Sequence, residues 1–275
     1  MAESLTQSNL EGSGQQPLSV SDLRGGYNGT PVIDGCNIEI GAGEIVVIMG
    51  GSGSGKSTFL RHLIGLKAPM AGRVHLFGES LYDLGEIDRL RLLKRIGVAF
   101  QSGALLSALS VGENVALPLV EHTVLDRELI DVIVRMKLDF VGLLGKEDLL
   151  PSELSGGMLK RVAVARAIAL DPKLIFLDEP SAGLDPAVAA ALDTLIIKPR
   201  DSLGMSVVVV THELESAFNI ADRIVVLDRG KIIFTGSVAM IKQSPSRRIQ
   251  NLINRVAEDE EFDPEAHLRR LIGEA

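Results

Sequence analysis

Residues 45–58, with the sequence IVVIMGGSGSGKST, decide the fold of this chain. Five apolar residues, the length of a short strand, come first. A loop follows directly, in which two glycines are separated by four residues and Lys-Ser comes after the second glycine. An amphipathic stretch, residues 59–64, comes after the loop. In the order strand, loop, helix, the loop backbone can form a nest of N–H groups for phosphate, and the helix adds its positive N-terminal end. The stretch therefore predicts a nucleoside triphosphate site rather than a flexible linker.

The residues of this loop have separate predicted parts in the site. Glycine lets the backbone fold tightly and approach the phosphates closely. Lys56 is expected to reach the β- and γ-phosphates, and the Ser57 hydroxyl to ligate Mg²⁺. The predicted nucleotide-binding loop consists of Gly50, Gly51, Ser52, Gly53, Ser54, Gly55, Lys56, Ser57 and Thr58.

The composition predicts a compact body with no membrane span. With 275 residues and 46% hydrophobic side chains, the chain can form one large α/β domain or two units that share a sheet. No apolar run approaches the roughly 18 residues that spanning a bilayer takes. The single cysteine, Cys36, fits a reducing compartment, and we interpret it as a small buried strand residue.

Charge gives little support for a nucleic-acid partner, and none is predicted. The net charge of −8 argues against a wholly basic binder. The best basic cluster is Arg89, Arg91, Lys94 and Arg95, which we interpret as the solvated face of a helix that leads into a strand at 96–100. Residues 1–16 lack a basic start and an apolar core, so they predict a disordered lead rather than a secretory signal.

Periodicity divides the chain into three kinds of structure. Residues 17–49 are strand-like and predict a β-rich layer, to which a strand at 72–77 is added. The middle, 112–170, predicts a helical insert, with Asp126 and Ser155 as helix caps. Strands and helices then alternate. A strand at 174–177 is followed by a helix from Asp185-Pro186, and a strand at 207–210 by a helix near Glu213. A hairpin of 224–227 with 231–234 comes last. The alternation predicts a parallel sheet with helices on both faces.

Two further groups of residues point to phosphate chemistry. Asp178 and Glu179 end an apolar strand, at the sheet edge where the phosphate loop is also expected. Asp178 is expected to hold Mg²⁺ through its water shell, and Glu179 to polarise the attacking water. Ser155, Gly156 and Gly157 begin a helix, which is an ordinary cap by itself but can also form a second anion site for a γ-phosphate.

In combination these motifs resemble those of the ATP-binding-cassette (ABC) ATPases. The resemblance covers residues 18–242. It rests on an ordered set: the loop 50–58, Gln101 after a strand, the signature Leu154–Met158, Asp178-Glu179, the loop Ser181–Asp185, and His212 after a strand. It implies an α/β fold, namely a P-loop ABC nucleotide-binding domain with a RecA-like parallel-sheet core, an antiparallel β subdomain and a helical subdomain. This ATPase domain is expected at 17–245, with the helical subdomain at about 102–170 and a C-terminal extension at 246–275.

The resemblance also implies roles for individual residues. Tyr27 lies where the family places an aromatic ring on adenine, although an exposed turn tyrosine is the alternative. Gln101 would touch Mg²⁺ and the water, and His212 would contact the γ-phosphate beside Glu179. Asp185 is expected to contribute to the ATP site. Met158 stands where the family usually has Gln, and this departure concerns the ATPase rate rather than ATP binding.

Two copies of the chain are expected to work together. In the ABC family the signature of one subunit closes over ATP bound to the other, and this chain holds a single phosphate loop. The resemblance therefore implies a head-to-tail dimer with two-fold symmetry.

A narrower resemblance concerns residues 101–111, the following Glu113-Asn114-Val115, and Met158. These are similar to the ATPases of Mla/Mce-type phospholipid transporters of double-membraned bacteria. The resemblance implies ATP-driven phospholipid movement between inner membrane and cell envelope, with an integral-membrane permease, a periplasmic Mce-type lipid-binding protein, and a location on the cytoplasmic face of the inner membrane. Residues 104–119 suit either a groove for a permease helix or the core of the helical insert. The tail from Ser246 is hypothesised to contact the neighbouring subunit or a small cytoplasmic accessory protein.

Other functions remain open at this point. The same motifs fit an ABC ATPase that acts as a regulatory or mechanical switch on a membrane partner, and the motor of an importer for another cargo. Soluble ABC ATPases of DNA repair or translation generally carry long coiled-coil inserts or two cassettes, and this sequence shows neither.

Overall fold

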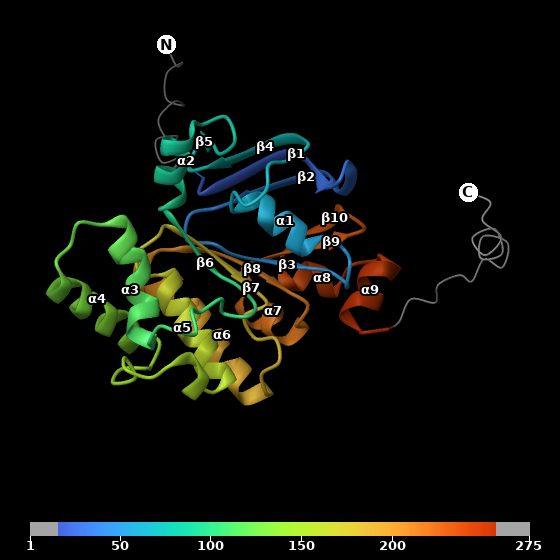
Figure 1. The fold of residues 1–275 in the computed structure, drawn as a ribbon. Coiled ribbons are helices and arrows are strands. Elements are labelled where there is room, and N and C mark those ends of the chain that lie inside the picture. The colour runs from blue at the N-terminus through green and yellow to red at the C-terminus, as the bar shows by residue number, and fades with distance from the viewer. Residues whose placement is uncertain (1–15, 257–275) are drawn as a thin grey trace, which may run out of the picture. The chain divides into compact units, whose positions relative to one another are not determined.

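The structure is a computed structural model that describes residues 16–256 (Figure 1). The predicted lead at 1–16 lies almost wholly outside the described residues, and so does the part of the expected C-terminal extension from 257 onward. The chain divides into two compact units after Val238. Each unit is described by itself.

An antiparallel sheet forms the first layer of the larger unit. Its strand order is β2-β1-β4-β5, with β1 (Leu18–Tyr27), β2 (Thr30–Ile40), β4 (Ala71–Leu76) and β5 (Glu79–Ser80). The predicted β-rich layer and the strand near 72–77 are confirmed, and Cys36 is buried on β2 as expected. One part of the prediction is wrong, because β3 (Ile45–Met49) belongs to the other sheet. All five β3 residues are buried, as is typical of a central parallel strand covered on both faces.

The second sheet has the order β10-β9-β3-β8-β7-β6. Its further strands are β6 (Ile96–Ala99), β7 (Leu174–Asp178), β8 (Ser206–Thr211), β9 (Arg223–Asp228) and β10 (Lys231–Gly236). The strands β9, β3, β8, β7 and β6 run parallel, whereas β10 pairs with β9 as the predicted antiparallel hairpin. The predicted parallel sheet is confirmed.

The register of this sheet brings four chain segments to one edge. Met49 pairs with Thr211, Val210 with Asp178, and Leu177 with Ala99. The residues that follow these strands therefore leave the sheet at the same carboxyl edge, where ligands of open α/β sheets bind. They are the phosphate loop, His212, Glu179 and the segment that carries Gln101.

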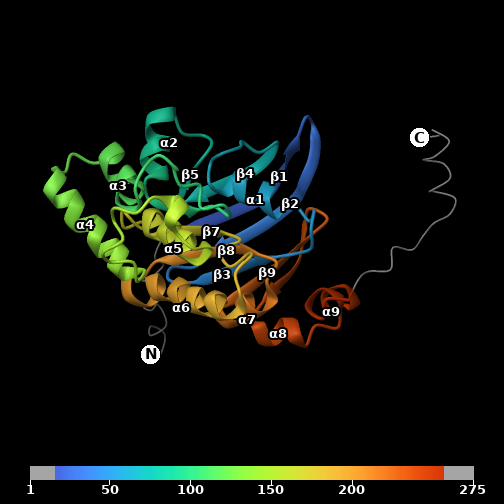
Figure 2. The same cartoon turned by 60° about the horizontal axis from the view of Figure 1, so that its bottom comes forward.

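Helices cover both faces of the parallel sheet. Helix α1 (Lys56–Leu63) lies between the two sheets and contacts β1, β2 and β8 (Figure 1). Its Phe59, Leu60 and Leu63 are buried, and burial of each contributes about 1.5–3 kcal/mol. Helices α6 (Pro186–Leu203) and α7 (Leu214–Ile220) lie against the opposite face, in contact with β8 and β3 respectively (Figure 2). This arrangement holds the phosphate loop, which joins β3 to α1, at the carboxyl end of the central strand β3.

The predicted helical insert is confirmed at one side of the sheet. It contains α3 (Val111–His122), α4 (Arg127–Phe140), the 3₁₀ helix η1 (Pro151–Glu153) and α5 (Gly156–Ala167), while α2 (Glu86–Leu93) precedes β6. Asp126 caps α4 by accepting from Leu129 N at 2.8 Å, and Ser155 caps α5 by accepting from Met158 N at 3.4 Å. Both predicted caps are therefore present. Helix α3 packs on α4 and α5, and the three helices lie together in both Figures 1 and 2.

In its described part, up to residue 256, the smaller unit contains two short helices, and α8 (Val238–Lys242) begins at the boundary. Ser246 caps α9 (Arg247–Ile253) by accepting from Ile249 N, so the expected C-terminal extension begins with a helix. Among the described residues, no helix combines the length and the apolar character that a membrane crossing requires.

Candidate active site

The loop 50–58 has the tight backbone that the sequence predicts. An added Cβ at Gly50 would lie 2.1 Å from Leu227 O and 2.7 Å from Ser54 Oγ. Gly53 and Gly55 have φ angles of +73° and +106°, a region that glycine adopts without steric cost. A side chain therefore fits at none of these three positions without strain, and the loop wraps close to its own backbone.

The N-terminus of α1 is prepared for an anion. Its N-cap residue, Gly55, has no side chain with which to cap the helix, so the first N–H groups have no side-chain acceptor. The first turn carries no acidic residue. Ser54 Oγ is buried and has no hydrogen-bond partner within residues 16–256. A phosphate group would satisfy these donors, because it supplies acceptor oxygens and the negative charge that a helix N-terminus favours.

Lys56 folds back over the loop from the first turn of α1. Its Nζ donates to Gly50 O at 2.9 Å and to Gly51 O at 3.1 Å. Burial lowers the pKa of Lys56, and the nearby carboxylates Glu179 and Asp178 act in the opposite direction. Among the described residues the ammonium thus donates to two loop carbonyls, and a phosphate oxygen would stabilise its charge.

Glu179 is held by the segment that follows β8. Its Oε2 accepts from Thr211 Oγ1 at 3.1 Å and from His212 N at 3.3 Å, and its Oε1 lies 2.8 Å from His212 Nδ1. The side chain is buried, and its φ of +46° is uncommon for a residue with a side chain. The structure therefore brings Glu179 and His212 together, as the sequence predicts. Thr211 had no signal in the sequence beyond its place at a strand end.

Asp178 provides the negative charge that a divalent cation would neutralise. Burial raises its pKa, and so does the neighbouring Glu179, whereas Lys160, Lys56 and Arg61 lower it. Two carboxylates at one strand end are unfavourable without a nearby cation. The donors expected to hold Mg²⁺, namely Ser57, Gln101 and Asp178, are hydroxyl, amide and carboxylate oxygens, which are the ligands that this ion prefers. The donor chemistry fits Mg²⁺.

The signature segment forms a second helix N-terminus, which Ser155 caps and which is exposed to solvent. Ser155 and Gly156 are exposed, and an added Cβ at Gly157 would lie 2.6 Å from Val188 Cγ1 of α6. The missing side chain at Gly157 therefore allows α5 to pack closely on α6. Asp185 caps α6 by accepting from Ala187 N and Val188 N, both at 3.1 Å. The Ser155–Gly157 segment is thus anchored to α6, which Asp185 caps. Ser155 and Gly156 face solvent.

Tyr27 ends β1 with an accessible ring. The side chain is 37% exposed, and its hydroxyl accepts from Arg61 Nη1 of α1 at 2.6 Å. Lys67 Nζ lies 3.5 Å from the ring centroid. A hydrogen bond with the Thr58 hydroxyl is the main cause that lowers the pKa of the phenol. The ring is therefore fixed beside the phosphate-loop helix, with a cation over one face.

Replacement of Tyr27 by alanine is expected to weaken ATP binding by about 1–3 kcal/mol, or roughly 5- to 150-fold, because a base stacked on an aromatic ring contributes this much. The Kd for ATP, measured by isothermal titration calorimetry, checks this. Tyr27→Phe is the control, since it keeps the ring and removes the hydroxyl bond to Arg61. Equal affinity of the alanine and wild-type proteins would support the alternative of an exposed turn tyrosine.

Lys160 is a site residue that sequence reasoning missed. It lies on α5, and its Nζ donates to Gln101 O and, at 3.1 Å, to Glu179 O. The residues it joins are 59 and 19 positions away in the chain, so no local pattern could have indicated the contact. Gln101 itself is exposed at the end of β6.

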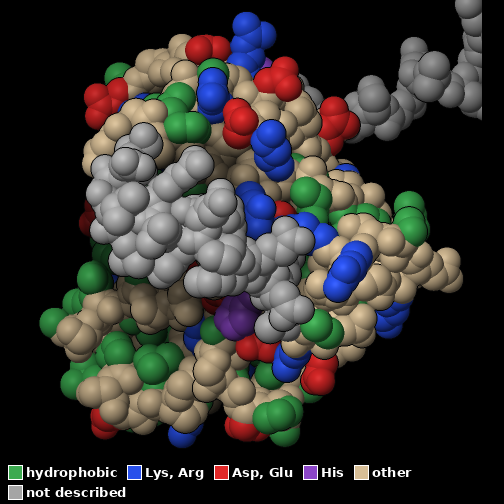
Figure 3. Space-filling model, turned by 90° about the vertical axis from the view of Figure 1, so that its right-hand side faces the viewer, with side chains coloured by type: hydrophobic (Ala, Val, Ile, Leu, Met, Phe, Trp, Pro, Cys, Tyr) green, Lys and Arg blue, Asp and Glu red, His purple; other side chains and the backbone are tan. Residues whose placement is uncertain are grey.

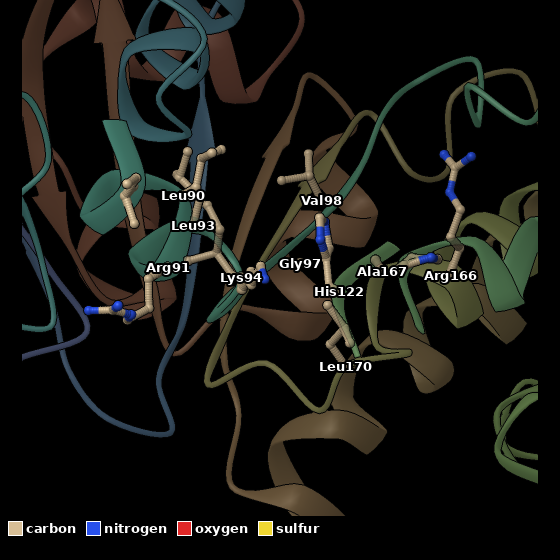
Figure 4. Close-up of a pocket in the computed structure, with 13 residues that line it drawn as sticks. Leu90, Arg91, Leu93, Lys94, Gly97, Val98, His122, Arg166, Ala167 and Leu170 are labelled. Atoms are coloured by element: carbon tan, nitrogen blue, oxygen red, sulfur yellow. The ribbon is translucent and has the colours of Figure 1, made fainter. Parts of the chain in front are cut away.

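A separate cavity of about 560 Å³ lies between α2 and the helical insert. Ile87, Leu90 and Leu93 of α2 line one wall, and Pro118 and Leu170 line the other. Basic side chains and a histidine surround these apolar residues, namely Arg91, Lys94, His122 and Arg166. Figure 4 shows the α2 side chains on one side of the cavity and Arg166, Ala167 and Leu170 on the other.

This cavity differs from the groove considered at 104–119. Of that stretch only Pro118 lines the cavity, whereas Val111, Val115, Ala116 and Leu119 are buried. The part of the stretch on α3 therefore packs the helical insert, whereas Ala104, Leu106 and Ala108 are exposed, so both interpretations stay open for 104–110.

The predicted basic cluster lies on and after α2, as a helix that leads into β6. Two of its members are paired with acids, because Arg91 bonds Asp88 at 2.9 Å and Arg95 bonds Glu79 at 3.2 Å. On another face of the molecule, Lys and Arg side chains are intermixed with Asp and Glu over the part that Figure 3 describes. The two ion pairs of Arg91 and Arg95 agree with a solvated helix face.

Comparisons with known proteins place the chain in a family. The family described as "ABC transporter" matches residues 33–182. The intermembrane phospholipid transport system ATP-binding protein MlaF of Haemophilus influenzae is 40% identical over 235 residues, which cover 86% of this chain and 89% of that protein. The methionine import ATP-binding protein MetN of Mesorhizobium japonicum is 39% identical over 237 residues, but these cover only 64% of MetN.

Solved structures agree with this result. The dimeric ATP-binding cassette MJ0796, bound to ADP and Pi, has a TM-score of 0.74 at 30% identity, over 80% of this chain and 98% of that one. The predicted fold, a parallel-sheet core with an antiparallel β layer and a helical insert, is thereby confirmed. The chain belongs to the ABC transporter family and is the ATPase subunit of a transporter.

Proposed function

We propose that this chain is the ATP-hydrolysing motor of a complex that moves phospholipid between the inner membrane and the cell envelope. The observation that carries the proposal is the 40% identity to MlaF over 86% of this chain and 89% of that protein. The similarity to MetN covers a smaller share of the relative, 64%. A phospholipid cargo is therefore favoured over an imported amino acid.

In the proposed reaction, the loop 50–58 holds the phosphates of ATP, with Lys56 on the β- and γ-phosphates. Ser57, Gln101 and Asp178 would hold Mg²⁺, which when bound neutralises charge on the phosphate oxygens. Glu179 polarises the attacking water. His212 Nδ1 lies 2.8 Å from Glu179 Oε1 and holds this carboxylate beside the γ-phosphate. Tyr27 stacks on adenine.

The working unit is proposed to be a head-to-tail pair of two copies. The Ser155–Gly157 helix start of one copy, with Asp185 nearby, would close over ATP held by the loop of the other. The exposure of Ser155 and Gly156 supports this, because it leaves the helix start accessible to a phosphate held by the other copy. MJ0796, which resembles this chain, is dimeric.

The cavity between α2 and the helical insert is proposed as the docking site of a permease helix that faces the cytoplasm. Its apolar walls suit the apolar face of an amphipathic helix. Lys94 and His122, which also line it, suit acidic residues on that helix. Ile87 and Leu90 are 76% and 53% exposed, so that a large apolar area stays in water until a partner covers it.

Replacement of Leu90 by glutamate is expected to weaken the permease contact at least tenfold. Burial of a leucine contributes about 1.5–3 kcal/mol, and about 1.4 kcal/mol already changes affinity tenfold. Co-purification of the permease with the tagged chain, compared at equal expression, measures the effect. Leu144→Glu is the matched control, since Leu144 is 58% exposed and does not line the cavity. Equal permease recovery with both variants would contradict the docking site.

Further partners and the domain boundaries are part of the same proposal. The permease would link the chain to a periplasmic Mce-type lipid-binding protein and hold it at the cytoplasmic face of the bacterial inner membrane. We also propose residues 17–245 as the ATPase domain, with the helical subdomain at about 102–170. The extension 246–275 would contact the neighbouring subunit or a small cytoplasmic accessory protein.

The experiment that tests the cargo is purification of the chain from detergent-solubilised native membranes, followed by mass spectrometry of the co-purifying proteins and lipids. A permease with an Mce-type protein and bound phospholipid is the expected result. A permease with an amino-acid-binding protein and no enriched lipid would favour the importer, to which the 39% identity with MetN points.

A further inference from the structure

Lys160 joins two main-chain segments that leave neighbouring strands. Gln101 follows β6 and Glu179 follows β7, and these strands pair in parallel. The Lys160 ammonium donates to the Gln101 carbonyl and, at 3.1 Å, to the Glu179 carbonyl. A single side chain of α5 thus connects the backbones of the two residues proposed to act on the attacking water.

A second cation of the same helix holds the loop after Gln101. Arg166 donates from Nη2 to Gly103 O at 2.7 Å and from Nη1 to Ala104 O at 2.8 Å. Gly103 and Ala104 have φ angles of +74° and +46°, and a positive φ is uncommon for alanine. The loop is therefore kept in an unfavourable conformation by contacts to α5 at both of its ends.

Lys160 has lost part of its contact with water. Burial lowers the pKa of Lys160, and the nearby carboxylates Glu179 and Asp178 act in the opposite direction. A charged group that has lost water is costly to leave without hydrogen bonds. The ammonium is therefore fixed at this position, and so are the two carbonyls that it binds.

We propose that Lys160 is a positioning residue for ATP hydrolysis, which sets the Gln101 main chain relative to that of Glu179. The inference rests on the roles proposed above for these two residues, because Lys160 acts through them. Misplacement of a reacting group by about 1 Å can lower a rate about 10²-fold. In the described part of the chain the hydrogen bonds of Lys160 Nζ go to these two carbonyls and not to the phosphate loop. The effect is therefore on turnover rather than on ATP affinity.

The test compares three variants in the complex purified from native membranes. Lys160→Met removes the ammonium and Lys160→Arg keeps a cation of similar reach. Lys198→Met is the matched control, because Lys198 also donates to a carbonyl, Phe140 O at 2.9 Å, but touches no proposed catalytic segment. Steady-state kcat and KM for ATP are measured, together with the Kd for ATP.

Lys160→Met is expected to lower kcat at least tenfold while the Kd for ATP stays within twofold of wild type. Lys160→Arg is expected to restore at least a third of the wild-type kcat, and Lys198→Met to keep the wild-type kcat. A kcat of Lys160→Met within twofold of wild type would overturn the inference. So would parallel losses of kcat and affinity with no rescue by arginine, since these indicate a structural role.

Glu179→Gln, assayed in the same preparation, separates this inference from the proposed function. If Glu179→Gln retains turnover, the catalytic role of Glu179 fails, and the inference fails with it. If Glu179→Gln abolishes turnover and Lys160→Met does not lower it, the proposed role of Glu179 stands and the inference alone is overturned.

Discussion

Replacement of Glu179 by glutamine is expected to lower ATP turnover by at least 10²-fold while ATP binding stays within a few-fold of wild type. A positioned general base contributes about 10²–10⁴-fold, and glutamine cannot accept a proton from water. Glutamine has the same shape, and its amide can still bond Thr211 and His212, which hold the carboxylate at 3.1 Å and 2.8 Å. The fold should therefore be unchanged. Steady-state phosphate release and the Kd for ATP check the two halves of this result.

The same variant should also accumulate a closed pair. If ATP bridges the phosphate loop of one copy and Ser155–Gly157 of the other, blocked hydrolysis keeps the bridge in place. Size-exclusion chromatography with light scattering should then show an ATP-dependent dimer. Glu215→Gln, which changes an exposed carboxylate of α7, is the control. Retention of more than a tenth of wild-type turnover by Glu179→Gln would assign the catalytic role to another residue.

Replacement of Lys56 by methionine is expected to lower ATP affinity by about 10- to 150-fold. A hydrogen bond to a charged group contributes about 1.5–3 kcal/mol, and Lys56 is positioned to make such bonds to phosphate. Its partners in the structure are two carbonyls of the loop, Gly50 O and Gly51 O, at 2.9 Å and 3.1 Å. Isothermal titration with ATP measures the loss.

The thermal stability of Lys56→Met provides an independent check. Burial lowers the pKa of Lys56 below its usual value of 10.5. Because the folded-state pKa is depressed, the charged ammonium at neutral pH costs stability, and its removal should leave Tm unchanged or slightly higher. Lys173→Met, at an exposed position, is the control for a general effect of charge. A large drop in Tm would mean that Lys56 supports the fold, and the affinity loss could not then be assigned to phosphate.

Local signals in the sequence predicted the elements of the site well. The loop 50–58 lies between an apolar run and an amphipathic run, and each of these forms its element from nearby residues. Asp126, Ser155 and Asp185 cap their helices with hydrogen bonds that reach two or three residues along the chain. Such contacts depend on local order alone, so sequence spacing is sufficient to find them.

Contacts between distant segments explain what the sequence did not predict. The periodicity of Ile45–Met49 marks a strand but does not say which sheet it joins, and only its five consecutive buried residues distinguish it from the alternating β2. A groove along 104–119 was one of two interpretations of that stretch, but one apolar wall of the cavity comes from α2, where Ile87 and Leu90 lie. Lys160 contacts Gln101 across 59 residues. These placements follow from the packing of helices on the sheet, which composition and spacing do not fix.

The most direct test of the account measures phospholipid transfer by the purified complex between donor and acceptor vesicles. The donor vesicles carry fluorescent phospholipid, and Mg²⁺ and ATP are added. The account predicts ATP-dependent transfer with wild-type chain and loss of the ATP-dependent part with Glu179→Gln. Robust ATP hydrolysis by the wild-type complex with no ATP-dependent lipid transfer would contradict it, and would favour a switch or another cargo.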